Sequence, residues 1–362
     1  MTVWKSILIA FSMFSAIPVP QTDWEERSMR YSLCAFPLVG VAVALLSFGW
    51  GKLCMVLSLP ELLRGAGYCL LPVLVTGGIH LDGYADTWDA LSSHAGAEKK
   101  QEILKDPHLG AFAGIRLCMY FTASLALWCA LPEVNVFCLL GIYGLSRCLS
   151  GIALVSFPLR PGSGLARSFA EAAEQTTVRR ILIGSALVFA GLMGVGGGIL
   201  CVIAAMLVFW QYKRLCEKKF GGLSGDLAGW FLSTAELWML GVLVASRYIG
   251  GWLSFVTGPL YAGKKTWIRE QLGLTEVELD ACAVWDVQNL VPTGNLEALV
   301  DELAMRRIVI ATEIGCGVVP IDPVERERRE AAGRLSCLLA ERAETVVRVC
   351  CGLPQLLKGE WP

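Results

Sequence analysis

Charged residues are scarce in this 362-residue chain, and this scarcity decides its class. Asp, Glu, Lys and Arg make up only 17% of the residues, against about a quarter in ordinary soluble domains. The 31 Lys and Arg nearly balance the 32 Asp and Glu, so the net charge is −1. Because no positive excess exists to attract a phosphate backbone, the chain is not expected to bind nucleic acid.

Histidine is also rare, and cysteine does not occur in the patterns of metal or disulfide sites. The three histidines are His80, His94 and His108. None of the 14 cysteines forms a Cys-x-x-Cys pair, and several lie inside apolar runs. A cysteine-based metal site and a disulfide framework are therefore excluded, and the cysteines are interpreted as small apolar side chains in a reducing compartment.

Apolar residues, by contrast, are abundant. They make up 55% of the chain, and the mean hydropathy is +0.56. An apolar stretch of about twenty residues spans roughly 30 Å of hydrocarbon as a helix. The sequence predicts such spans at 33–57, 62–79, 112–131, 134–156, 181–210 and 231–255, with 5–17 as a possible seventh. The stretch 181–210 is long and interrupted by glycines, so it is either one tilted helix or two short ones.

Lys and Arg gather in three connecting segments, 80–111, 157–180 and 211–230. Short loops rich in Lys and Arg face the cytoplasm. Two spans separate the first two of these loops, so both can lie on the same side of the membrane. A hairpin or re-entrant segment at 181–210 would keep the third loop on that side as well. The sequence leaves the number of crossings open. We expect a multi-pass protein of the cytoplasmic membrane, with the lipid bilayer as a partner and these loops in the cytoplasm.

The composition changes near residue 257. Residues 257–362 contain 12 Lys and Arg and 16 Asp and Glu, whereas the first 256 residues contain only 35 of the 63 charged residues. Strands are predicted at 308–311 and 346–350, and helices at 294–305 and 323–343. This alternation predicts an all-α membrane domain over 1–255, with six or seven transmembrane helices, followed by a small α/β soluble domain over 256–362.

An acidic loop follows the second predicted span, in the stretch GGIHLDGYADTWDAL. Asp82, Asp86 and Asp89 stand at i, i+4 and i+7, so on a helix their carboxylates lie within about 60° of one another. No Lys or Arg occurs between Arg64 and Lys99 to compensate their charge.

Three carboxylates beside hydrocarbon are costly. Each costs roughly 2.5–3.5 kcal/mol at membrane depth, and like charges also repel. A bound divalent cation would compensate them, and oxygen ligands without cysteine suit Mg²⁺ or Mn²⁺, whose remaining coordination sites hold substrate phosphates. Asp82, Asp86 and Asp89 are the predicted metal ligands, and His80 is a further ligand or a supporting group. The alternative is an ordinary first helical turn whose acids face water.

Basic residues suited to phosphate lie elsewhere in the chain. Lys105, followed by Asp106, precedes the third span and could neutralise a phosphate or simply anchor the span. Arg147 lies inside an apolar span and needs an anionic partner, which a phosphate or one of the acids would supply.

A glycine-rich stretch, GGLSGD at 221–226, resembles a phosphate-cradling loop or a flexible turn. It contains Gly225 and Asp226. Together with Glu236, Asp226 is expected to place further carboxylates at the membrane edge.

These stretches resemble, in order, the cobalamin synthase (adenosylcobinamide-GDP ribazoletransferase) family. The matching stretches are IPVP at 17–20, FPLVG at 36–40, GGIHLDGYADTWDAL at 77–91, LKDPHLGAFAGI at 104–115, LSR at 145–147, RPGSGL at 160–165 and GGLSGDLAG at 221–229. They are spread over nearly all of residues 1–250, and the His-Leu-Asp-Gly-x-Ala-Asp block is highly specific.

The resemblance implies a Mg²⁺-dependent integral membrane enzyme. A hydroxyl of α-ribazole, or of its 5′-phosphate, attacks the cobinamide-side phosphate of adenosylcobinamide-GDP, and GMP leaves. The three aspartates would bind the metal, and one of them or His80 would take the hydroxyl proton. The residues predicted to bind the substrate and its phosphates are Lys105, Asp106, Arg147, Arg160, Gly225, Asp226 and Glu236. Other cobalamin-assembly enzymes are expected partners.

The tail resembles a second family of the same pathway, the adenosylcobinamide kinase/guanylyltransferases. The match is clearest in ATEIGCGVVP at 311–320, and VTGPLYAGKKT at 256–266 falls where that family has its P-loop. Gly258, Gly263 and Lys264 have the spacing that cradles phosphates, but Lys265 replaces the Mg²⁺-binding Ser or Thr.

This P-loop-like domain is also short, and no histidine follows position 108, so the guanylylated histidine of that family has no counterpart. We interpret it as a degenerate nucleotide-binding domain, with vestigial binding at most, that serves docking or regulation. Kinase activity is not expected.

Two other functions compete with this prediction. A CDP-alcohol phosphotransferase also uses clustered aspartates beside membrane helices, but its Asp-Gly-x-x-Ala-Arg run has no match at 82–87. An ion-coupled secondary transporter would suit the glycine-broken 181–210 stretch, but no internal repeat is evident.

Overall fold

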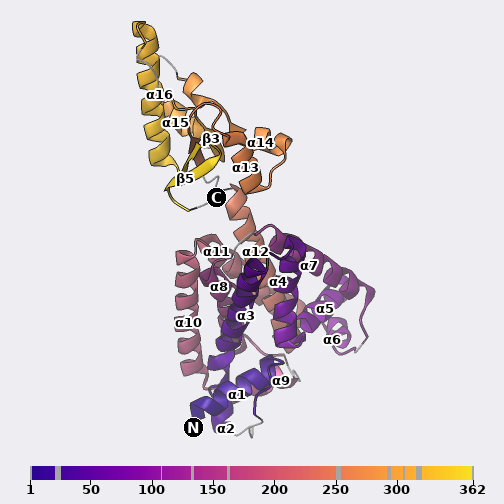
Figure 1. Ribbon diagram of the computed structural model, residues 1–362. Helices are drawn as coiled ribbons and strands as arrows, with labels where there is room; N and C mark the ends of the chain where they lie inside the picture. The colour runs from indigo at the N-terminus through magenta and orange to yellow at the C-terminus, as the bar shows by residue number, and fades with distance from the viewer. Residues whose placement is uncertain are drawn as a thin grey trace. The chain divides into compact units, whose positions relative to one another are not determined.

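The computed structural model of the chain describes residues 2–20, 26–106, 108–131, 134–160, 164–249, 254–291, 295–304, 306–314 and 320–360. Two compact units result, Met1–Ser246 and Arg247–Pro362 (Figure 1). Parts of the predicted segments lie outside the described residues, namely 107, 161–163, 250–253, 294, 305 and 315–319.

The first unit is a helical bundle. Within its described residues, six helical segments are long and apolar enough to cross a membrane, and a bent pair of helices makes a seventh if it counts as one span. The six contain α3 (Phe36–Val56), α7 (Ala111–Cys129), α8 (Val136–Leu154), α10 (Gln175–Val195), α11 (Ile199–Leu215) and α12 (Gly225–Ile249). Both α3 and α10 pack on α8 (Figure 1). The predicted all-α membrane fold is therefore confirmed.

Shorter helices complete this unit. The apolar α1 (Thr2–Phe14) has 13 residues, which gives about 20 Å of helix and is too short to cross the bilayer alone. The candidate seventh span at 5–17 is therefore not a full crossing. The remaining short elements are α2 (Glu26–Met29), η1 (Ser32–Ala35), α6 (Ala97–Ile103), α9 (Gly164–Ala172) and the π-helix η2 (Cys216–Phe220).

The stretch predicted at 181–210 consists of two helices. The first, α10, starts at Gln175, and α11 ends at Leu215, so the pair is longer than predicted at both ends. The chain turns at Gly196, Gly197 and Gly198, where Gly198 N–H donates to Met193 O at 2.8 Å. The two-helix alternative is therefore confirmed, and a single tilted helix is wrong.

The predicted span 62–79 breaks at its end. Helix α4 (Glu61–Thr76) is followed by α5 (Ile79–Ser92) after a bend of 96°. Gly77 and Gly78 make the bend with φ of 66° and 79°, a left-handed conformation that glycine adopts without a steric penalty. The acidic stretch His80–Asp89 lies on α5, so it is a helix, and the expectation of a loop was wrong.

Two glycines allow α5 to approach α12 closely. A Cβ on Gly83 would lie 2.6 Å from Asp226 O, and a Cβ on Gly229 would lie 2.7 Å from His80 O. Because neither residue has a side chain, the two backbones come into direct contact, as at other small-residue crossings of membrane helices. The contact brings the acids of α5 beside the first turn of α12.

A buried ion pair joins α8 to α12. The Arg147 guanidinium pairs with Glu236, with side-chain exposures of 1% and 12%. Ser146 Oγ donates to Glu236 Oε1 at 3.0 Å, and Arg147 Nη1 also donates to Tyr143 O at 2.9 Å. Glu236 therefore lies within a helix and not at the membrane edge as predicted, and it is the anionic partner that Arg147 requires.

Within its described residues, the second unit is a five-stranded sheet with helices on both faces. The strand order is β2-β3-β1-β4-β5, in which β5 is antiparallel to β4 and the other neighbours pair in parallel. The strands are β1 (Ser254–Thr257), β2 (Ala283–Val284), β3 (Ile308–Ile310), β4 (Thr345–Cys350) and β5 (Leu353–Lys358). The helices are α13 (Lys264–Leu272), α14 (Glu276–Cys282), η3 (Val287–Asn289), α15 (Leu296–Leu303) and α16 (Pro323–Arg342).

Successive residues of β1 point into two different cores. Phe255 packs with Leu303 and Leu335 of α15 and α16, whereas Val256 packs with Trp267 and Leu279 of α13 and α14. This alternation is typical of a parallel sheet covered on both faces. It confirms the α/β prediction, and the predicted strands and helices start and end within two residues of the observed ones.

The substitution Arg147→Met is expected to destabilise the first unit, because it leaves Glu236 buried without its counter-charge. The expected loss is about 3–5 kcal/mol in the free energy of unfolding, whereas the double variant Arg147→Met/Glu236→Leu recovers most of it. As a matched control, Arg167→Met removes an exposed pair with Glu171 and should cost less than about 1 kcal/mol. Denaturant unfolding in detergent measures all three. A single Arg147 variant as stable as wild type would contradict a structural role for the pair.

Candidate functional site

A cavity of about 380 Å³ lies where α5 meets the start of α12. Its wall is built from α1, α3, α5, the turn after α6, the end of α8, α9 with the segment before it, and α12 with the turn before it. Six residues predicted from the sequence line it: His80, Asp82, Lys105, Arg160, Gly225 and Asp226. The cavity thus brings together residues that are up to 146 positions apart in the sequence.

The three Lys- and Arg-rich segments meet at this end of the bundle. Gln101 Nε2 donates to Phe220 O at 3.1 Å. Leu159 pairs with Leu223 as an isolated β-bridge, and Arg160 N–H donates to Leu223 O at 3.0 Å. Residues 221–224 of the glycine-rich stretch are therefore a turn held against the segment after α8, while Gly225 and Asp226 begin α12. Ser224 caps α12 by accepting a 3.3 Å hydrogen bond from Leu227 N–H.

The carboxylates of α5 do not all face the same surroundings. Asp82 is exposed and lines the cavity. Asp86 is half-buried, and Asp82, Asp89 and Asp226 all lie close enough to repel its negative charge. A Cβ on Gly110 would clash with the Asp89 carboxylate. Asp89 therefore faces the start of α7, where the helix dipole favours negative charge.

Positive charge in the cavity comes from Arg160 and Lys105. Arg160 is 5% exposed and lies close enough to Asp226 to attract it. Its Nε has no hydrogen-bond partner among the described residues. Lys105 is exposed. A buried guanidinium with a spare donor, beside an exposed ammonium, is suited to hold a phosphate.

Three residues predicted to bind substrate do not line the cavity. Arg147 and Glu236 are engaged with each other inside the bundle. Asp106 is exposed and accepts hydrogen bonds at 3.0 and 2.7 Å from the backbone N and Nδ1 of His108. It shapes the turn before α7 and is not among the described residues that line the cavity.

Besides Arg160 Nε, two further buried polar atoms in the cavity wall lack partners within the described part of the chain. They are His80 Nε2 and Ser150 Oγ. Leaving such an atom unpaired costs about 1–3 kcal/mol, so a ligand that bonds to it gains that energy. His80 was predicted. Ser150 was missed, although its position in an apolar span, one helical turn after Arg147, is a usable signal.

An aromatic cluster forms the apolar part of the wall. The rings of Phe14 and Phe36 lie 4.3 Å apart, and those of Phe14 and Phe169 lie 5.7 Å apart. Phe36 also meets His80 edge-on at 6.1 Å. The sequence did not single out these rings, because phenylalanine is common in apolar runs and the three come from separate segments.

The donor atoms fit a hard divalent cation. Among the described residues, no three His, Cys, Asp or Glu side chains converge closely enough to ligate one ion. Mg²⁺ in phosphate-transfer sites is usually held by one or two carboxylates plus substrate phosphates and water. Asp82, Asp86 and Asp226 supply oxygen donors of that kind beside the cavity.

The P-loop-like segment of the second unit is closed on itself. Lys264 is 9% exposed, and its Nζ donates to Gly258 O at 2.9 Å and to Pro259 O at 2.7 Å. Burial lowers the pKa of Lys264, although the charges of Asp286 and Glu313 oppose this shift. Lys265 Nζ pairs with Glu276 Oε1 at 2.6 Å. Lys265, which replaces the Mg²⁺-binding Ser or Thr of a P-loop, is thus a cation paired with an acid.

Comparison with known proteins agrees with the two-unit division. Residues 6–244 match the family described as cobalamin-5-phosphate synthase, and residues 255–357 match cobinamide kinase / cobinamide phosphate guanyltransferase. A curated relative from Lachnoclostridium phytofermentans, named adenosylcobinamide-GDP ribazoletransferase, is 40% identical over 254 residues, which cover 68% of this chain and 95% of the relative.

Further relatives carry the same name. One from Geobacillus thermodenitrificans is 30% identical over 251 residues, covering 67% of this chain and 95% of its own. Another from Clostridium botulinum is 29% identical over 240 residues, covering 65% and 95%. The family match at 6–244 covers nearly all of the helical unit, and the chain therefore belongs to the cobalamin-5-phosphate synthase family, with a cobinamide kinase-like unit joined after it.

Proposed function

We propose that this multi-pass membrane enzyme joins adenosylcobinamide-GDP to α-ribazole, or to α-ribazole 5′-phosphate, and releases GMP in a Mg²⁺-dependent reaction. One observation carries the proposal. A single cavity collects carboxylates from α5 and α12, a buried arginine and an exposed lysine, which are the groups that phosphate transfer requires. The names of the relatives indicate the nucleotide-linked substrate.

The reaction exchanges a phosphoanhydride bond for a phosphate ester bond. A hydroxyl oxygen of α-ribazole forms a bond to the cobinamide-side phosphorus, the bond from that phosphorus to the bridging oxygen breaks, and GMP leaves with both electrons. Arg160 and Lys105 neutralise charge on the phosphates. Mg²⁺ held by Asp82 and Asp86 would polarise the diphosphate and stabilise the departing GMP.

The hydroxyl proton must pass to a group on the cavity wall. Asp82 and His80, both predicted for this role from the sequence, line the cavity and have the chemistry to accept it, as does Asp226. The unpartnered Nε2 of His80 supports His80 as a group that contacts the hydroxyl or a phosphate oxygen.

The aromatic cluster suits the second substrate. α-Ribazole carries a flat aromatic base, and Phe14, Phe36 and Phe169 offer ring surfaces on the same wall. At about 380 Å³ the cavity lies at the small end of the range for ligand pockets. It therefore holds the reacting phosphates and the base, while the bulky cobinamide remains outside.

The substitutions Asp82→Asn and Asp86→Asn are expected to lower kcat for GMP release by about 100-fold or more, because they remove charge that stabilises the transition state. GMP release from detergent-solubilised protein, with both substrates present, is the measurement, and chelation should abolish it until Mg²⁺ is restored. Glu171→Asn, at an exposed acid of α9, is the control. Wild-type rates in both variants, or turnover that chelators do not affect, would sink the metal assignment. Turnover without α-ribazole, or ion-coupled uptake without GMP release, would favour the competing functions.

We also propose that the cavity end of the bundle faces the cytoplasm. Its loops carry most of the Lys and Arg of the first unit, and such loops remain inside.

Cysteine labelling tests this orientation. In a variant whose exposed native cysteines are replaced by serine, Lys99→Cys should react with a membrane-impermeant maleimide only after cell lysis. Leu57→Cys, in the turn between α3 and α4, should react in intact cells. The reverse pattern would contradict the orientation, and the same assay at a position after Ser246 reports the side reached by the chain beyond the bundle.

For the second unit we propose a docking or regulatory role without kinase activity. The support is the contact of Lys264 with its own loop and the pairing of Lys265 with Glu276, which leave the phosphate-binding cations of a P-loop otherwise engaged.

Accordingly, Lys264→Ala in the full chain should change the rate of GMP release less than twofold, like the matched control Lys265→Ala. Incubation of the wild-type chain with adenosylcobinamide and ATP or GTP should give no phosphorylated product by mass spectrometry. Product formation that disappears in Lys264→Ala would show that the unit is an active kinase.

A further inference from the structure

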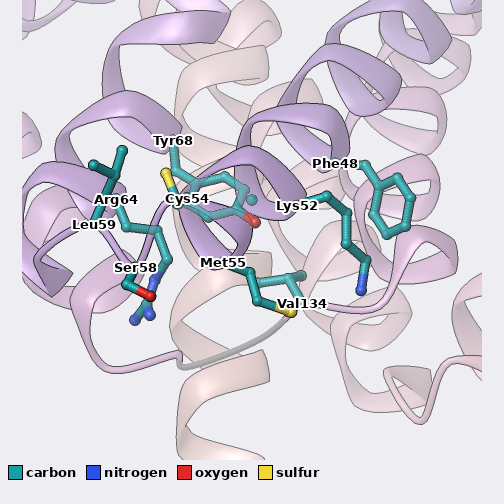
Figure 2. Close-up of a pocket in the computed structure, with 10 residues that line it drawn as sticks. Phe48, Lys52, Cys54, Met55, Ser58, Leu59, Arg64, Tyr68 and Val134 are labelled. Carbon is teal, nitrogen blue, oxygen red and sulfur yellow. The ribbon is translucent and has the colours of Figure 1, made fainter.

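A second cavity, of about 230 Å³, lies at the other end of the bundle (Figure 2). Its wall comes from the end of α3, the turn to α4, the first turns of α4, and Val134 before α8. Phe36, which lines the first cavity, and Lys52, which lines the second, are 16 residues apart on α3. That separation is about 24 Å along the helix axis, so the two cavities are distinct.

The second cavity is cationic. Lys52 and Arg64 line it, and none of the described residues in its wall is acidic. Figure 2 shows Arg64 with Ser58 on one side of Tyr68, and Lys52 with Phe48 on the other. The site already described shares none of these residues.

Arg64 is held in place and yet has spare donors. Its Nη2 donates to Leu131 O at 3.1 Å, while Trp50 Nε1 donates to Arg64 O at 3.0 Å. Glu61 approaches only to 3.4 Å and is 64% exposed, which makes it a weak partner. Arg64 Nε is buried and has no hydrogen-bond partner in the described part of the chain. A positioned guanidinium with an unpaired donor favours an oxyanion.

The surface around this cavity is apolar. The exposed side chains on α3 and α4 nearby are Leu53 (48%), Met55 (53%), Val56 (80%), Leu62 (65%) and Leu63 (48%). The segment that contains α3 is long and apolar enough to cross a membrane, and α4 passes the same test together with α5, so these side chains would face acyl chains. A ligand seated here meets a cationic cavity and hydrocarbon at once, a combination that suits an amphiphile better than a free ion.

We propose that this cavity binds the headgroup of an anionic phospholipid. The lipid phosphate accepts hydrogen bonds from Arg64, Lys52 supplies a second positive charge, and the acyl chains pack on the exposed leucines of α3 and α4. Basic pockets between membrane helices hold acidic headgroups in this way. The lipid would fill the space between the end of α3, the start of α4 and the start of α8. It would so stabilise the bundle at the end away from the first cavity.

Native mass spectrometry of the full chain in detergent tests the proposal. The probes are dioleoyl phosphatidylglycerol, dioleoyl phosphatidylcholine and inorganic phosphate. Phosphatidylglycerol should be retained about tenfold more than phosphatidylcholine, and Arg64→Gln should lower its retention about tenfold, as expected for loss of a charge-assisted hydrogen bond. Lys52→Gln, which leaves the Arg64 contacts intact, should lower it about fivefold. The matched control Arg179→Gln, at an exposed position near the start of α10, should have no effect.

The following results would contradict the binding of an anionic phospholipid at this cavity. Equal retention of the two lipids, or unchanged retention in both Arg64→Gln and Lys52→Gln variants with wild-type unfolding curves, would overturn the proposal. An equal loss in the Arg179→Gln control would show that net charge alone is responsible. Displacement of the lipid by millimolar inorganic phosphate would show that free phosphate is the ligand, and the assignment to a lipid would be wrong.

Discussion

Charge inside an apolar bundle must be compensated where it lies, and this constraint shapes the whole first unit. Arg147 and Glu236 satisfy each other, so their pair links α8 to α12 without outside help. The negative charges of Asp86 and the acids around it are not balanced by buried cations in this way. Asp82, Asp89 and Asp226 all repel Asp86, while Arg160 is the buried cation beside them. A surplus of negative charge at a cavity that also receives phosphates is the physical reason for expecting a divalent ion there.

Much of this architecture could be predicted from the sequence, because hydropathy reports helix length and solvent directly. Asp82 and Arg160 were found for a related reason, since charged residues stand out against an apolar background. The right-angled bend at Gly77 and the contact of α5 with α12 at Gly83 and Gly229 could not be predicted. A glycine in sequence does not reveal which backbone will approach it, and hydropathy gives the end of the apolar span near residue 79 but not the direction in which the chain continues.

The partner of Arg147 illustrates the same limit. The sequence requires an anion near a buried guanidinium but does not choose between a substrate phosphate and any of several acids. That choice depends on which helices are neighbours, and Glu236 faces Arg147 only because α12 packs beside α8. In the second unit, the sequence revealed the substituted residue but not the conformation of the residue beside it. The replacement of Ser or Thr by Lys265 was visible in the sequence, but the turning of Lys264 toward Gly258 O and Pro259 O was not, because it depends on loop conformation.

The bend of 96° between α4 and α5 has a geometric consequence for catalysis. Because α4 runs along the bundle, α5 lies nearly across it, and the row from Asp82 to Asp89 extends sideways for about 10 Å. All three carboxylates then sit at a similar depth. A diphosphate bound beside Asp82 in the cavity therefore meets the next carboxylate, Asp86, without being carried deeper toward hydrocarbon. Had the helix continued straight, Asp86 would lie about 6 Å further along the bundle than Asp82.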